Sequence, residues 1–282
     1  MAARQIAENL DYINWTVLVG LALGAFAVVV LARLRTPATR GYLAFTSACA
    51  VVFGILASIA DSGLPTAPSV SALSSSFALS VDPTWEAPRR LALVAFTVVA
   101  AAYTIAVARE RPAPALGIGG LGFGAVVLVA AALGWSAGPA TAVPLVVQLA
   151  ALSAATGGVF AAMILGHWYL VTPKLPEATL VFVSRILLWV VAVQVALFVV
   201  WVATGTGGGG PFSALSGQWA LFVWLRLLVG LVFPLVVSWA AIQTARSRSM
   251  ESATGLLYID LGAIAAGTIV AAGLYFGAGM LV

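Results

Sequence analysis

Two residue types that carry much of protein chemistry are nearly missing from this chain. Among 282 residues there is one histidine, His167, and one cysteine, Cys49. A single cysteine allows no internal disulfide and no cysteine-based metal cluster. Zinc and copper sites need several histidine or cysteine ligands, so we expect no metal site. Protease-type catalysis needs a histidine beside a nucleophile and an acid, and the sequence marks no such group. An accessory, non-catalytic subunit is therefore favoured over a stand-alone enzyme.

The lone histidine also argues against haem. Small membrane cytochromes often hold haem between histidines on different helices, and this chain cannot supply such a pair by itself. Met163 lies one turn before His167 on the same expected helix, so it cannot bind the opposite face of an iron. A haem would need five-coordinate iron or a partner's ligand, and we do not expect one.

Charged residues are scarce as well. They make up 8% of the chain, hydrophobic residues make up 62%, and the mean hydropathy is +1.11. A soluble domain has about 25% charged residues. The longest polar connection, residues 61–90, is too short for a soluble domain. We therefore predict one integral membrane domain over residues 1–282, with membrane lipids and other membrane subunits as partners and no nucleic-acid partner.

Long apolar runs fill most of the sequence. A helix needs about 20 apolar residues to cross the hydrocarbon core, and the runs lack the alternating pattern of a membrane barrel. The sequence predicts an all-α, polytopic transmembrane helical bundle of about eight spans. They cover approximately residues 13–33, 42–60, 91–108, 115–135, 143–171, 179–203, 219–244 and 255–281.

Basic residues are unevenly divided between the connections. Those at one end of the expected bundle carry eight: Arg33, Arg35, Arg40, Arg109, Arg111, Lys174, Arg246 and Arg248. Those at the other end carry Arg4, Arg89 and Arg90. Short cytoplasmic connections retain Lys and Arg. We therefore expect a bacterial-type plasma (inner) membrane, with both termini on the extracytoplasmic side.

Ionisable residues inside spans are costly and are candidates for function. His167, Arg185 and Asp260 are expected at similar depths near the cytoplasmic end of three spans. Trp168 and Tyr169 adjoin the histidine, and Met163 shares its helix face. A histidine, a carboxylate and aromatic rings suit a quinone head group, through hydrogen bonding, proton exchange and stacking. These six residues form the predicted cofactor-binding site, with quinone as the possible cofactor.

The same residues have a structural interpretation. Trp168 and Tyr169 would then belong to the aromatic belt at the membrane interface, Arg185 would extend to the headgroups, and Asp260 would pair with a neighbour. Both interpretations remain open from the sequence.

The seventh expected span carries a second candidate site. Arg226 lies about seven residues from its extracytoplasmic end, where we expect it either to bind an anionic group, a lipid phosphate or a partner's carboxylate, or to extend to the headgroups. Pro234 is expected to bend this span near its middle. Elsewhere, Gly20 and Gly24 lie one turn apart and predict close helix packing.

Three functions fit these features. The first is a membrane subunit of a respiratory or photosynthetic electron-transfer complex that contacts a quinone or another lipophilic cofactor near the cytoplasmic face. The second is a small-solute or ion transporter, although no clear internal repeat supports it. The third is a purely structural subunit that packs against larger partners.

Overall fold

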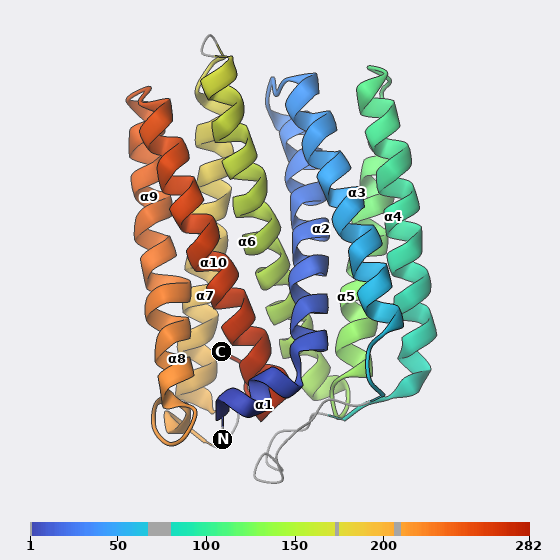
Figure 1. Cartoon of the computed structure of the whole chain (residues 1–282), viewed down its shortest axis with the longest axis vertical. Helices are drawn as coiled ribbons and strands as arrows, with labels where there is room; N and C mark the ends of the chain where they lie inside the picture. Colours follow the sequence, from blue (N-terminus) through green and yellow to red (C-terminus); the bar gives the residue numbers. More distant parts are fainter. Residues whose placement is uncertain (1, 67–79, 173–174, 206–209) are drawn as a thin grey trace.

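The computed structural model describes residues 2–66, 80–172, 175–205 and 210–282. Within these ranges the chain is helical and contains no strand. It forms an elongated bundle of nearly parallel and antiparallel helices (Figure 1). Eight segments of the described chain are long and apolar enough to cross a membrane. The predicted all-α bundle of about eight spans is therefore confirmed, and the protein is a multi-pass membrane protein.

The helices follow one another along the chain, and the longest connections lie between α3 and α4 and between α7 and α8. The spans are α2 (Leu10–Arg35), α3 (Arg40–Ser62), α4 (Glu86–Ala108), α5 (Pro114–Gly134), α6 (Pro139–Val171), α7 (Ala178–Thr204), a segment made of α8 (Ala220–Leu227), η4 (Leu228–Val232) and α9 (Phe233–Arg246), and α10 (Met250–Ala278). Short helical turns, η2 (Pro83–Trp85) and η3 (Ser213–Leu215), precede α4 and α8.

Both termini lie at the same end of the bundle, where α1 (Ala2–Glu8) packs against α10 (Figure 1). The helix ends that border the connections with most of the basic residues lie at the opposite end (Figure 1). Lys174, one of those basic residues, is outside the described residues. The even number of spans thus places the two ends of the chain together.

The two most buried spans, α2 and α6, run side by side through the middle of the bundle. They touch through their backbones at Gly24. A Cβ atom at this position would lie 2.9 Å from the Gly157 Cα atom and still closer to the Ser153 carbonyl. Close packing at Gly24 is confirmed, because only a residue without a side chain lets the two helices approach so closely.

The start of the last span differs from the prediction, and this changes the depth of Asp260 in the span. The last span begins at Met250, five residues before the predicted start at 255. The prediction followed the apolar run, but helical hydrogen bonding continues through the polar first turn that contains Glu251. Asp260 therefore lies ten residues, or about 15 Å, along α10.

Candidate functional site

The predicted site residues on α6 and α7 face different surroundings. His167 and Arg185 are both exposed on the outer surface of the bundle. Met163, one turn before His167, is half-buried and packs against the core. No hydrogen bond or ion pair within the described ranges joins His167, Arg185 and Asp260 to one another. The common pocket predicted for them therefore remains a prediction.

Trp168 and Tyr169 hold the end of α6 in place. The indole ring of Trp168 lies over Gly41 at the start of α3, where a Cβ atom would come within 3.0 Å of the ring. Tyr169 is buried, and its hydroxyl donates a hydrogen bond of 2.6 Å to the Pro176 carbonyl. That bond connects α6 to the segment that leads into α7. Both aromatic residues thus have a structural role in addition to any contact with a ligand.

Asp260 lies in the core between α9 and α10. Its side chain is inaccessible to solvent, and its Oδ2 atom accepts a hydrogen bond of 2.6 Å from the Ser238 hydroxyl. Its Oδ1 atom is buried and has no hydrogen-bond partner among the described residues. Asp260 therefore keeps one oxygen that can accept a further hydrogen bond or a proton.

Arg226 is buried and belongs to α8, which lies in the half of the bundle nearer the termini (Figure 1). Its guanidinium donates to the Gln194 side chain on α7, with Nη2 and Oε1 2.6 Å apart. Gln194 in turn donates from Nε2 to the Ala151 carbonyl on α6, at 3.0 Å. Arg226 therefore points into the helix bundle and not towards the headgroups.

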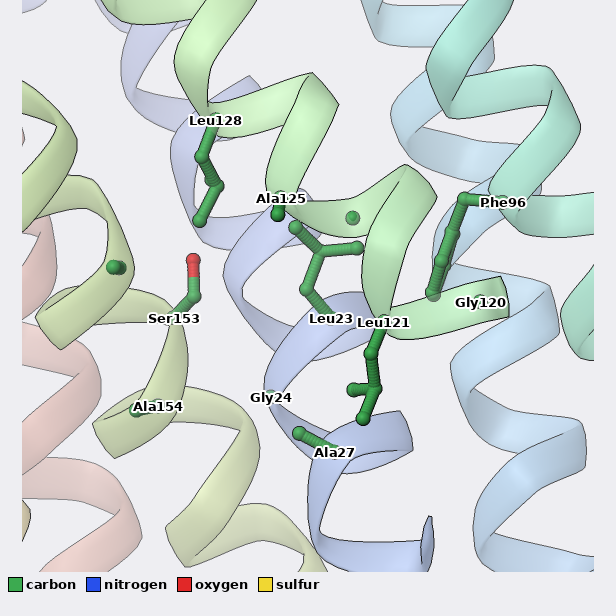
Figure 2. A pocket seen from close by; sticks show the side chains of 12 residues that line it. Leu23, Gly24, Ala27, Phe96, Gly120, Leu121, Ala125, Leu128, Ser153 and Ala154 are labelled. Carbon is green, nitrogen blue, oxygen red and sulfur yellow. The ribbon is translucent and has the colours of Figure 1, made fainter. Parts of the chain in front are cut away.

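The structure also contains an apolar pocket that the sequence did not reveal (Figure 2). It has a volume of about 200 Å³ and lies near the middle of α2, α5 and α6, with one residue from α4. Its lining residues are Leu23, Gly24, Ala27, Phe96, Gly120, Leu121, Gly124, Ala125, Leu128, Ala150, Ser153 and Ala154. Gly120 and Gly124 were a partial signal in the sequence, because they let the Phe26 and Leu23 side chains of α2 pack closely against α5.

Ser153 is the one lining residue with a polar side chain. The residue is 6% exposed, and its hydroxyl points towards Leu128, another lining residue of the pocket (Figure 2). No hydrogen bond to another described residue engages this hydroxyl. The pocket thus combines apolar walls with a single group that can donate or accept a hydrogen bond.

A further cluster of charges was also missed. At the end of the bundle that carries the termini, the buried Asp61 carboxylate binds Arg89 and Arg90, with closest distances of 2.8 and 2.9 Å. The indole nitrogen of Trp15 donates to the same carboxylate at 2.7 Å. Asp61 lies at the end of α3 and Arg89 lies in the first turn of α4. The signal in the sequence was therefore a pair of opposite charges at the adjoining ends of two consecutive spans. This cluster joins α2, α3 and α4. Both oxygens of the Asp61 carboxylate accept hydrogen bonds from within the cluster.

Comparison of the chain with protein-family models, with curated protein sequences and with solved structures found no match.

Proposed function

We propose that the protein is a membrane subunit of an electron-transfer complex that binds a quinone or a closely similar lipophilic molecule. The observation that carries this proposal is the apolar pocket at α2, α5 and α6, with the free Ser153 hydroxyl inside it. In this proposal the redox centres that exchange electrons with the quinone belong to partner subunits.

The size and chemistry of the pocket support a ring-shaped head group. An apolar cavity of about 150 Å³ accepts a benzene molecule, so 200 Å³ suits a single substituted ring. Phe96 supplies an aromatic wall, which suits stacking on a flat ring. The Ser153 hydroxyl would donate a hydrogen bond to one quinone carbonyl. Ala125 lines the pocket and is exposed, so an isoprenoid tail would extend past it into the lipid.

The residues around His167 have a second role in the proposal, which is to contact quinone outside the pocket. His167 would contact quinone that approaches along the outer surface of the bundle, with Trp168, Tyr169 and Met163 beside it and Arg185 on the neighbouring span. Asp260 would exchange protons through its unused oxygen. We assign the bound ring to the apolar pocket because His167 is exposed on the outer surface of the bundle.

The proposal includes a membrane and an orientation. The excess of basic residues at one end favours a bacterial-type inner membrane, with that end in the cytoplasm and both termini outside. The large exposed side chains on the outer surfaces of α3, α4 and α7 support contacts with lipids and with partner subunits.

The first experiment is purification of the full chain from its native membrane in mild detergent, with mass spectrometry of bound lipophilic molecules and proteins. Co-purification of redox subunits and of quinone at a fixed ratio to the chain is the expected result. Ala125→Phe, which fills the pocket, should lower bound quinone severalfold. Val126→Phe adds the same ring at a neighbouring exposed position outside the pocket lining and should retain the quinone. Equal quinone in the two variants would contradict the assignment.

A second candidate function is transport of an ion or a small solute. The observation that favours it is the irregularity in the seventh span, where the π-helical turn η4 begins two residues after the buried Arg226. Interrupted helices often line binding sites in transporters. A homogeneous oligomer without quinone and without redox subunits would favour this candidate.

A further inference from the structure

Arg226 places a positive charge inside the bundle, and no carboxylate of the described residues forms an ion pair with it. The residue is 3% exposed, and a guanidinium keeps its proton in proteins. No ion pair within residues 2–66, 80–172, 175–205 and 210–282 includes it, although six are present elsewhere. An isolated buried charge is strongly unfavourable unless an opposite charge or a set of hydrogen bonds compensates for it.

The hydrogen bonds of Arg226 go only to neutral acceptors. Nη2 donates to Gln194 and Nη1 donates to the Gly230 carbonyl, at 2.6 and 3.2 Å. The Nε atom is buried and has no acceptor among the described residues. The guanidinium is therefore held in one orientation while one of its donors remains unused.

Pro234 explains why the Gly230 carbonyl can accept a hydrogen bond from Arg226. In a regular helix the N–H group four residues after Gly230 would donate to the Gly230 carbonyl, but a proline at position 234 has no N–H group. The chain widens into the π-helical turn η4, and the carbonyl accepts a hydrogen bond from Arg226. Such turns occur frequently at functional sites.

Two glycines make room for the guanidinium between η4 and α10. A Cβ atom at Gly267 would lie 2.5 Å from the Gly230 Cα atom and 3.0 Å from Nη1 of Arg226. The helices therefore cross backbone against backbone beside the charged group. An alanine at position 267 would force either the crossing or the guanidinium to move.

A small cavity adjoins the guanidinium. It has a volume of about 10 Å³ and is lined by Gln148, Ala151, Leu152, Gln194, Leu197, Trp201, Arg226 and Val282. Space of this size holds one guest about as large as a water molecule. Gln148 is buried and its Oε1 atom has no partner among the described residues. Rotation of its amide group by half a turn presents an N–H₂ donor at the same place.

We propose that this cavity binds one monatomic anion of the halide class, with chloride as the physiological ion. Arg226 supplies the charge and an unused donor, and Gln148 supplies a second donor from α6. Carboxylate and phosphate groups are too large for a cavity of this volume. A water molecule would fill the space but would leave the charge of Arg226 uncompensated. This site lies apart from the proposed quinone pocket and does not depend on it.

The test is binding of radioactive chloride to the detergent-purified full chain, in buffers whose other anion is gluconate. Saturable binding of one chloride per chain is expected. Arg226→Met should abolish it. Arg185→Met removes the same charge from an exposed position and should leave the Kd unchanged.

Gln194→Glu keeps the proposal testable if Arg226→Met fails to fold. Its carboxylate would stand 2.6 Å from Nη2 in place of the amide oxygen, so it would neutralise Arg226 and raise the Kd for chloride at least about tenfold, which corresponds to about 1.4 kcal/mol. Gln194→Met also loses the amide donor but adds no charge, and it should still bind chloride. Absence of saturable binding in the unmodified chain, or equal binding by the two Gln194 variants, would overturn the proposal.

A second readout is the thermal unfolding midpoint. Chloride should raise the midpoint of the unmodified chain because a ligand that binds only the folded state stabilises it by mass action. The midpoint of Gln194→Glu should not respond to chloride. A midpoint that responds equally in both proteins would mean that chloride acts elsewhere.

Discussion

The Asp61 carboxylate and the Arg89 guanidinium form a buried ion pair through two hydrogen bonds, with Nε–Oδ2 and Nη2–Oδ1 distances of 2.8 and 3.2 Å. The Arg89 guanidinium also lies 4.8 Å from the centre of the Trp135 ring. The pair therefore ties α3 to α4, and the cation–π contact extends the connection to the end of α5.

Asp61→Asn should destabilise the bundle by about 3–5 kcal/mol, because it leaves the Arg89 charge buried without a partner. The measurement is the thermal unfolding midpoint of the purified protein in a fixed detergent. Glu86→Gln is the control, since Glu86 and Arg90 form a largely exposed pair that contributes about 1 kcal/mol or less. Similar losses for both variants would show that burial does not set the strength of the Asp61 pair.

Gly24→Ala should disrupt the contact between α2 and α6. The added carbon would overlap the Ser153 carbonyl and approach Gly157, so the helices must separate, at a cost of about 1–3 kcal/mol or more. Gly122→Ala is the control, because nothing lies within 4 Å of its Cβ position. The yield and the unfolding midpoint of the two variants give the comparison. An unchanged Gly24→Ala protein would contradict the close approach of the helices.

Tyr169→Phe removes the hydroxyl that donates to the Pro176 carbonyl. We expect a loss of about 0.5–1.5 kcal/mol, the usual contribution of one hydrogen bond. Hydrogen exchange of the amides at the start of α7 should become faster, because this bond fastens the segment that precedes α7. Tyr258→Phe, at a position 49% exposed, should change neither quantity. Unaltered exchange in Tyr169→Phe would remove the structural role of this hydroxyl.

His167→Ala should leave insertion and assembly intact, because the imidazole is exposed and forms no hydrogen bond with a described residue. If His167 contacts a quinone, the variant should show a lower rate of electron transfer between the native complex and quinone. Its elution volume in size-exclusion chromatography should not change. Failure of the variant to insert would instead make the histidine a structural residue. His167→Gln keeps a hydrogen-bonding side chain and should retain more of the activity.

The spans were predictable because each needs only a long apolar run, and the bilayer allows helices to form from such runs without knowledge of their neighbours. The buried position of Arg226 was harder to predict. A long side chain at its depth either extends to the headgroups or turns inward, and the choice depends on Gln194 and Gly230, which come from a neighbouring helix and from the following turn.

The apolar pocket was not predictable for a related reason. Its lining comes from four helices, and a hollow between helices depends on how their crossing angles leave side chains unmatched. The sequence shows where the small residues are, but it does not show the angles at which the helices cross. Similarly, the depths of His167, Arg185 and Asp260 were approximated from span ends, but depth alone does not specify which way each side chain faces around its helix.

Pro234 limits how the sequence of this protein can evolve. By removing one N–H group it leaves the Gly230 carbonyl to the arginine eight residues before the proline. An alanine at position 234 would restore the competing donor and weaken the hold on Arg226. The proline and the arginine are therefore expected to be inherited together, so that homologous chains which lose one should also lose the other.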